Sequence, residues 1–101
     1  MSLACRAGTA HLSQDQSECS RLMAVTAALS VLEDDPCTNA GFGSNLSWLG
    51  FAECDASVMD SSSGAYGAVG AMQGIQHPSE VAARMALEGL TPLSGGRVRP
   101  M

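Results

Sequence analysis

Two asparagines and two glycines lie close together between residues 37 and 46, in the segment best suited to chemistry. Asn39 and Asn45 carry side-chain amides that can bond the backbone or a ligand. Gly41 and Gly43 permit a positive φ or a close approach of the backbone. The pattern predicts a loop whose amides and main-chain groups can bond the backbone or a ligand, although Asn39 taken alone is more often a turn residue.

An acidic run precedes this loop. Glu33, Asp34 and Asp35 fall at the end of a predicted helix, where the partial negative charge of the helix dipole disfavours carboxylates. Two interpretations stay open from the sequence alone. Either water solvates the carboxylates at a surface helix end, or a bound cation or a nearby basic group offsets their charge.

The remaining polar residues carry weaker signals. Glu53, Asp55 and Asp60 do not form a convincing catalytic carboxylate pair, and we expect them to bond the backbone or an arginine. The cysteines include no Cys-x-x-Cys pair, which makes a metal site improbable and favours free thiols. They are Cys5, Cys19, Cys37 and Cys54.

Hydrophobic periodicity predicts the elements that position these residues. A helix is expected over residues 21–33, with Ser20 as its N-cap and Pro36 ending it. Three strands and a second helix follow, the helix introduced by Pro78 and stopped by Gly89. The expected strands are residues 46–49, 52–59 and 65–72, and the second helix is residues 81–88. Residues 1–20 and the tail from residue 91 are predicted to be irregular.

Composition limits the class of protein. The chain has 101 residues, of which 46% are apolar, but 15 of these are Ala and only 19 are Leu, Ile, Val or Phe. Such small side chains bury little area, so the sequence suggests a piece of something larger. A net charge of −5 with five Arg and no Lys argues against nucleic acid as a partner. No apolar run approaches the ~20 residues of a membrane span, and no signal peptide is evident. We therefore expect a soluble intracellular protein.

Several motifs in a fixed order resemble a known family. Leu32-Glu33-Asp34-Asp35-Pro36 is followed by Thr38-Asn39-Ala40-Gly41-x-Gly43-Ser44-Asn45-Leu46 and then by Glu53-Cys54-Asp55-Ala56-Ser57-Val58-Met59-Asp60. This order resembles the N-terminal part of threonine aspartases (taspases), in the asparaginase-like branch of the N-terminal nucleophile hydrolases. The resemblance covers about residues 21–100. The Ser44-Asn45-Leu46 continuation is closer to the taspases than to ordinary type 2 asparaginases.

The resemblance implies an α+β fold that is part of an αββα sandwich, here without its first strand and its second half. It divides the chain into an irregular leader, residues 1–20, and a partial α-subunit domain, residues 21–101. Enzymes of this branch arise by autoproteolysis, which makes a Thr the N-terminus of a β-subunit, where its own α-amine activates the hydroxyl. Taspases cleave proteins after Asp. This sequence contains no Asp-Thr dipeptide, and its one Gly-Thr, at Thr9, lies upstream of the matching loop.

The resemblance also assigns roles to individual positions. Asn39 stands where the family places an asparagine against the nucleophilic Thr, and Gly41 and Gly43 let the backbone approach that site. His77 stands where the family usually has an N-capping Asn, and we interpret it as a substitute cap. In related asparaginases, main-chain carbonyls of the preceding loop hold a monovalent cation, expected to be Na⁺. The matching residues are Leu32, Glu33, Asp35, Thr38, Ala40 and Phe42.

Three functions are compatible with the sequence. The first is an α-subunit-like fragment of a threonine-type endopeptidase, inactive alone because the nucleophile lies in a β-subunit that is its expected partner, with protein substrates for the complete enzyme. The second is a non-catalytic fragment that binds and modulates a full-length protomer. The third is the equivalent fragment of a type 2 asparaginase or isoaspartyl peptidase. In each case we expect no nucleic acid and no membrane partner, and a cytoplasmic or nuclear location.

Overall fold

The computed structural model describes residues 2–14 and 18–91. Three α-helices, a short 3-10 helix and one antiparallel two-stranded sheet make up this part of the chain, so the predicted α+β class is confirmed. The elements are α1 (Ser2–Gln14), α2 (Glu18–Asp34), η1 (Gly41–Gly43), β1 (Cys54–Met59), β2 (Tyr66–Met72) and α3 (Pro78–Glu88). The irregular tail predicted from residue 91 lies, after its first residue, outside the described residues.

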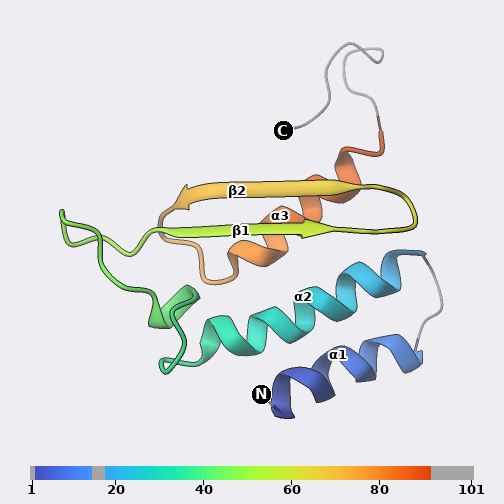
Figure 1. The fold of residues 1–101 in the computed structure, drawn as a ribbon, viewed down its shortest axis with the longest axis horizontal. Coiled ribbons are helices and arrows are strands. Elements are labelled where there is room, and N and C mark those ends of the chain that lie inside the picture. Colours follow the sequence, from blue (N-terminus) through green and yellow to red (C-terminus); the bar gives the residue numbers. More distant parts are fainter. Residues whose placement is uncertain (1, 15–17, 92–101) are drawn as a thin grey trace.

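Helix α1 replaces most of the predicted irregular leader, and that expectation was wrong. It runs beside α2 in the opposite direction (Figure 1). Ala4 is buried, and a Cβ on Gly8 would lie 3.0 Å from the carbonyl oxygen of Ala24 and 3.4 Å from the Cβ of Ala28. Close packing of small residues against α2 stabilises this helix. The sequence signal was weak because a small-residue contact leaves no stripe of large apolar side chains.

Helix α2 is longer than predicted and begins before Ser20. Ser20 is therefore a buried residue inside the helix and not its N-cap. Two buried or half-buried hydroxyls farther along satisfy their own hydrogen bonds, because Thr26 Oγ1 donates to the Leu22 carbonyl (2.7 Å) and Ser30 Oγ to the Thr26 carbonyl (3.0 Å). Carbonyl groups of the helix itself thus pair both of these hydroxyls.

The sheet pairs β1 with β2, with Val58 opposite Gly67 and Met59 opposite Tyr66. A bulge between Cys54 and Ala56 interrupts the register. Strand β1 lies within the strand predicted over residues 52–59, and along it Cys54, Ala56 and Val58 are turned inward while the residues between them are exposed. The periodicity of two therefore identified this strand correctly.

The strand predicted over residues 46–49 was wrong. Only one isolated bridge forms there, between Leu46 and Ala52, because the chain turns back at Gly50, whose φ is +84°. The tip of this hairpin projects from the body of the protein (Figure 1), and Trp48 in it is fully exposed. Within the described residues no second strand pairs with this segment, so its apolar side chains stay in solvent.

Helix α3 lies against one face of the sheet, and small residues allow a very close contact. A Cβ on Gly67 would overlap the carbonyl oxygen of Ala82 and lie 2.6 Å from the backbone nitrogen of Ala86. Ala82 and Ala86 are themselves buried. The small residues of β2 therefore allow α3 to pack closely against the sheet.

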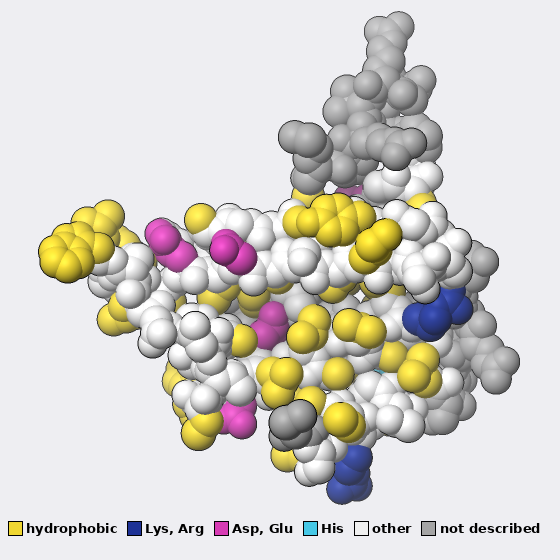
Figure 2. Space-filling model, in the orientation of Figure 1, with side chains coloured by type: hydrophobic (Ala, Val, Ile, Leu, Met, Phe, Trp, Pro, Cys, Tyr) yellow, Lys and Arg dark blue, Asp and Glu magenta, His cyan; other side chains and the backbone are white. Residues whose placement is uncertain are grey.

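The core of the described residues is small. Its buried apolar residues are mostly alanines, and the larger ones are Leu22, Val58 and Pro78. Met59 and Tyr66, on the sheet face turned away from α3, are 69% and 59% exposed. Figure 2 shows hydrophobic side chains on the surface over the strands and at the hairpin tip. The second sheet of the expected sandwich is not among residues 2–14 and 18–91, and none of the helices described there has the length and apolar character to cross a membrane.

Candidate functional site

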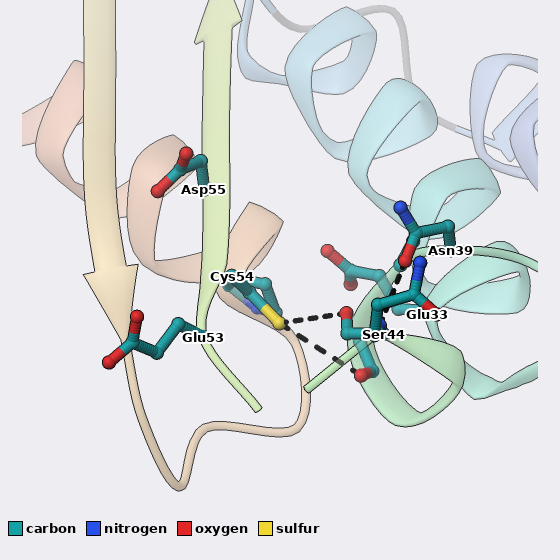
Figure 3. A pocket seen from close by; sticks show the side chains of 10 residues that line it. Glu33, Asn39, Ser44, Glu53, Cys54 and Asp55 are labelled. Atoms are coloured by element: carbon teal, nitrogen blue, oxygen red, sulfur yellow. Dashed lines mark hydrogen bonds between the residues drawn. The ribbon is translucent and has the colours of Figure 1, made fainter. Parts of the chain in front are cut away.

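A cavity of about 320 Å³ lies where the end of α2, the loop after it, the start of β1 and the start of α3 meet. It brings together residues from distant parts of the sequence (Figure 3). Three of its side chains are carboxylates and none is basic. The cavity is lined by Glu33, Asn39, Ala40, Gly41, Ser44, Asn45, Glu53, Cys54, Asp55 and Pro78.

Asn39 is held in the cavity wall by a backbone contact. Its Oδ1 accepts a hydrogen bond from the Asn45 backbone N–H at 2.9 Å (Figure 3). A backbone N–H can only donate, so the amide oxygen must face Asn45 and the Nδ2 amino group is left as a donor for another partner. The loop therefore fixes which end of this amide is available for chemistry.

Gly41 and Gly43 are both required by close backbone packing. Gly41 has a φ of +51°, and a Cβ on it would lie 2.5 Å from the Glu33 carbonyl oxygen. A Cβ on Gly43 would overlap the Thr38 carbonyl oxygen and lie 2.9 Å from that of Pro36. The loop can fold this tightly only with glycine at both positions, while their contact with a substrate stays a prediction.

The structure adds Ser44 and Cys54 to the cavity, although no role was predicted for either side chain. Ser44 Oγ and Cys54 Sγ share a hydrogen bond of 3.1 Å, and the thiol also lies 3.9 Å from the Gly41 carbonyl oxygen. Figure 3 shows Cys54 turned toward Ser44, whereas Glu53 and Asp55 lie toward β2. The inward position of Cys54 in the alternation of β1 was the signal that could have found it.

Glu33 is another side chain that the sequence did not assign to the site. Its carboxylate is buried, and Oε1 and Oε2 accept hydrogen bonds from Ser79 N–H (3.0 Å) and Ser79 Oγ (2.9 Å). The prediction concerned only its main-chain carbonyl. These bonds join the end of α2 to the first turn of α3, across 46 residues of sequence.

A basic group beside Asp34 resolves part of the open question about the acidic helix end. Asp34 Oδ1 accepts from Gln76 Nε2 at 2.9 Å and lies 2.9 Å from His77 Nε2. Asp35 accepts the backbone N–H of Cys37. His77 occupies the N-cap position of α3 but makes no side-chain cap bond, so its predicted capping role was wrong. The imidazole turns toward Asp34, and the Ser79 N–H donates its hydrogen bond to Glu33 instead.

The His77–Asp34 pair makes the stability of the chain depend on pH. The hydrogen bond that His77 donates to Asp34 raises the pKa of His77 above its ordinary 6.5, and the hydrogen bonds that Gln76 and His77 donate to Asp34 lower the pKa of Asp34 below 3.8. A raised histidine pKa means that the stabilisation is complete below about 6.5 and is lost as the pH rises through the folded-state value. The Asp34 contribution is lost as the pH falls below about 3.8.

We therefore expect the melting temperature to fall as the pH rises from about 6 to about 9. The His77→Gln variant should lack this part of the pH dependence, whereas the exposed His11→Gln variant should keep it. Thermal melts by circular dichroism at matched ionic strength measure the effect. If the melting temperature of His77→Gln changed with pH as that of the unsubstituted chain does, the His77–Asp34 pair would contribute nothing to the pH dependence of stability.

The other carboxylates make the kinds of contact expected of them. Asp55 Oδ1 accepts the Ala71 backbone N–H at 2.7 Å, where Ala71 has a φ of +52°. Asp60 bonds Arg21 and the Ser63 N–H and hydroxyl, and the Ser63 bonds contribute most to a strongly lowered Asp60 pKa. Glu53 accepts from the side chain of Gln73. These bonds confirm that backbone and arginine contacts hold Asp55 and Asp60.

The residues expected to hold a cation span the end of α2, the loop after it and η1. Carbonyl oxygens of Asp35, Pro36 and Thr38 converge where a side chain on Gly43 would stand. Thr38 Oγ1 donates to the carbonyls of Leu32 and Asp35, and Ala40 accepts from Gly43 N–H. The Glu33 carbonyl faces Gly41, and the Phe42 side chain is exposed. The described His, Cys, Asp and Glu side chains form no metal-binding group, so a cation here would rely on carbonyls.

Comparison with known proteins places these features in a family context. The family model described as asparaginase matches residues 1–92, including the leader that the resemblance had left out. The chain is 46% identical over 65 residues to isoaspartyl peptidase/L-asparaginase of Mus musculus and 48% identical over 65 residues to that of Homo sapiens. These matches cover 64% of this chain and 20% and 21% of the relatives. Plant-type L-asparaginase of Pyrococcus horikoshii is 42% identical over 66 residues, 65% of this chain and 22% of that protein. The chain thus spans about a fifth of the length of these curated relatives, whose names support the broader family and not the taspases in particular.

Proposed function

We propose a function for this chain on the basis that it belongs to the asparaginase family. The chain is the segment of an asparaginase-type hydrolase that forms one wall of the active site, and the complete enzyme cleaves an amide bond beside an aspartyl or asparaginyl group. The observation that carries the proposal is the 2.9 Å bond that orients Asn39 in the cavity. The names of the relatives favour an isoaspartyl peptidase or L-asparaginase.

Asn39 supplies a hydrogen-bond donor to the reaction. Its Nδ2 group is held by the loop before any substrate arrives, so little reorganisation is needed at the transition state. Such a donor can hold the oxygen of a nucleophilic Thr or the negative charge that develops on the attacked carbonyl. The three carboxylates of the cavity cannot do this when ionised, because they only accept hydrogen bonds.

The nucleophile comes from another segment of the enzyme. The resemblance places it on a Thr that autoproteolysis exposes, with its own α-amine as the base. Thr9 does not fit this role, because its hydroxyl donates to the Cys5 carbonyl within α1 at 2.7 Å. We therefore expect the 101-residue chain to hydrolyse nothing by itself.

A completing polypeptide covers the sheet face turned away from α3. The exposure of Met59, Tyr66 and Trp48 supports this partner, as does a core whose buried apolar residues are mostly alanines. A second sheet packed on this face would produce the αββα sandwich. If the chain instead binds a full-length protomer without forming a site, mixing the two would give binding and unchanged or lowered activity.

An exchange chimera tests the proposed activity. In isoaspartyl peptidase/L-asparaginase of Homo sapiens, the matching 65 residues are replaced by those of this chain. We expect the chimera to release ammonia from L-asparagine and to cleave a β-aspartyl dipeptide. A chimera with the parent's melting temperature and autoproteolysis but no activity on either substrate would refute the proposal.

A second candidate is the threonine-type endopeptidase that cleaves proteins after Asp. It is favoured by one observation, namely that the Ser44-Asn45 pair, which carries the closer resemblance to taspases, lines the cavity. The same chimera separates the candidates when it is given a protein-derived peptide with an internal Asp. Cleavage of this peptide, absent from the parent enzyme, would favour the endopeptidase.

We further propose that the loop after α2 holds Na⁺ through main-chain carbonyls, as the resemblance implies. The convergence of the Asp35 and Thr38 carbonyls beside Gly43 supports a cradle that any side chain there would fill. At a Na⁺ concentration of about ten times Kd, binding would stabilise the chain by about 1.4 kcal/mol. We expect a higher melting temperature in sodium chloride than in choline chloride at equal ionic strength. Equal melting temperatures in the two salts would contradict the site.

A further inference from the structure

We propose that Glu33 is the positioning residue that fixes the Asn39 loop against the start of α3. The contribution of Glu33 to catalysis rests on the proposed function, whereas its effect on the loop does not. Glu33 is 5% exposed and Ser79 is 1% exposed, and both carboxylate oxygens bond Ser79. The first-turn N–H groups of a helix lack partners within the helix and lie at its positive end. Glu33 therefore caps α3 from another helix, since His77 provides no side-chain cap.

The same residue contacts the loop directly. A Cβ on Gly41 would lie 2.5 Å from the Glu33 carbonyl oxygen, 2.7 Å from its Cβ and 2.9 Å from its Cα. The backbone of Gly41 is thus pressed against Glu33, two residues after Asn39. Glu33 therefore bonds α3 through its carboxylate and packs against the loop through its backbone and Cβ. A displacement of Glu33 must move Gly41, and with it the Asn39–Asn45 bond.

Burial makes the Glu33–Ser79 contact sensitive to substitution. Removal of the carboxylate leaves the Ser79 N–H and hydroxyl without their acceptors in a buried place, which is costly. Glutamine has the same shape, and its amide oxygen can accept from Ser79 N–H while its amino group donates to Ser79 Oγ. Glu33→Ala should therefore disturb the loop, and Glu33→Gln should largely preserve it.

Amide hydrogen exchange on the full 101-residue chain tests the proposal. The reporter is the Asn45 N–H bonded to Asn39, and the reference is the Asp60 N–H, bonded to the Ala65 carbonyl at 2.9 Å in a distant turn. We expect Glu33→Ala to accelerate exchange at Asn45 by about tenfold or more relative to Asp60, with Glu33→Gln close to the unsubstituted chain. Val58→Ala, which weakens the core, should change both amides together.

Each alternative outcome has a definite meaning. Equal acceleration at Asn45 and Asp60 in Glu33→Ala would reduce Glu33 to a general structural role, and an unprotected Asn45 in the unsubstituted chain would also overturn the proposal. If Glu33→Ala does not fold, Ser79→Ala tests the proposal in its place, because this variant removes only the hydrogen bond from the Ser79 hydroxyl. The proposal then requires that Ser79→Ala accelerate exchange at Asn45 and not at Asp60. An inactive exchange chimera with normal exchange behaviour would refute the proposed function but not the positioning role.

Discussion

Replacing Asn39 by alanine in the exchange chimera is expected to lower kcat by about 10²–10³-fold with little change in KM. Removal of one preorganised donor from the site of developing charge has an effect of this size. Asn39 is exposed and its Oδ1 accepts a hydrogen bond from Asn45 N–H, so the fold should tolerate its loss. Steady-state hydrolysis of a β-aspartyl dipeptide, with a thermal melt of the same sample, measures both quantities.

The neighbouring asparagine provides the control for this substitution. Asn45→Ala keeps the backbone N–H that orients Asn39, and it should therefore retain most of the activity. Asn39→Asp keeps the oxygen that accepts this N–H but replaces the donor by an acceptor, and it should be as impaired as Asn39→Ala. A kcat for Asn39→Ala within a few-fold of the chimera would remove Asn39 from the mechanism.

The largest effect on stability is expected for Gly67→Ala. The added Cβ overlaps the Ala82 carbonyl and approaches the Ala86 nitrogen to 2.6 Å, and both are backbone atoms of α3. A flexible side chain could move aside, but here the helix must shift from the sheet. We expect a loss of about 3 kcal/mol or more, which for a chain of this size lowers the melting temperature by about 12–24 °C.

Gly64→Ala is the matched control, because it replaces a glycine without creating a steric clash. Gly64 has a φ of +70°, but a Cβ there meets no atom within 4 Å. Its substitution should cost only the strain of the left-handed conformation, about 1–2 kcal/mol. If thermal melts gave Gly67→Ala the smaller loss, the close contact between α3 and β2 would not be a main source of stability.

The sequence was sufficient for elements with a regular hydrophobic pattern or a clear stop signal. The alternation along β1 and the Pro78 start of α3 are local features, and the structure agrees with both. Helix α1 was missed because its stability comes from contacts of Ala4 and Gly8 with another helix. The strand over residues 46–49 was overpredicted because apolar side chains favour a strand even where only one bridge can form.

For the candidate site too, local sequence patterns were sufficient for some residues and not for others. The Asn39 loop was identified because its asparagines and glycines are close in the sequence. The Glu33–Ser79 bond joins residues 46 positions apart, and no local pattern indicates it. His77 was assigned to a cap because of its place before Pro78, but the carboxylate of Asp34 competes for the imidazole. Contacts between distant segments decided the outcome for Glu33 and for His77.

The most direct test of the central claim compares three proteins in one assay of β-aspartyl dipeptide cleavage. They are the 101-residue chain alone, the Homo sapiens relative without the matching 65 residues, and the exchange chimera. If this chain forms one wall of an asparaginase-family active site and lacks the nucleophile, only the chimera will release product. The account would be contradicted by a chimera that folds and matures like its parent yet stays inactive, or by turnover of the chain alone that Thr9→Ala abolishes.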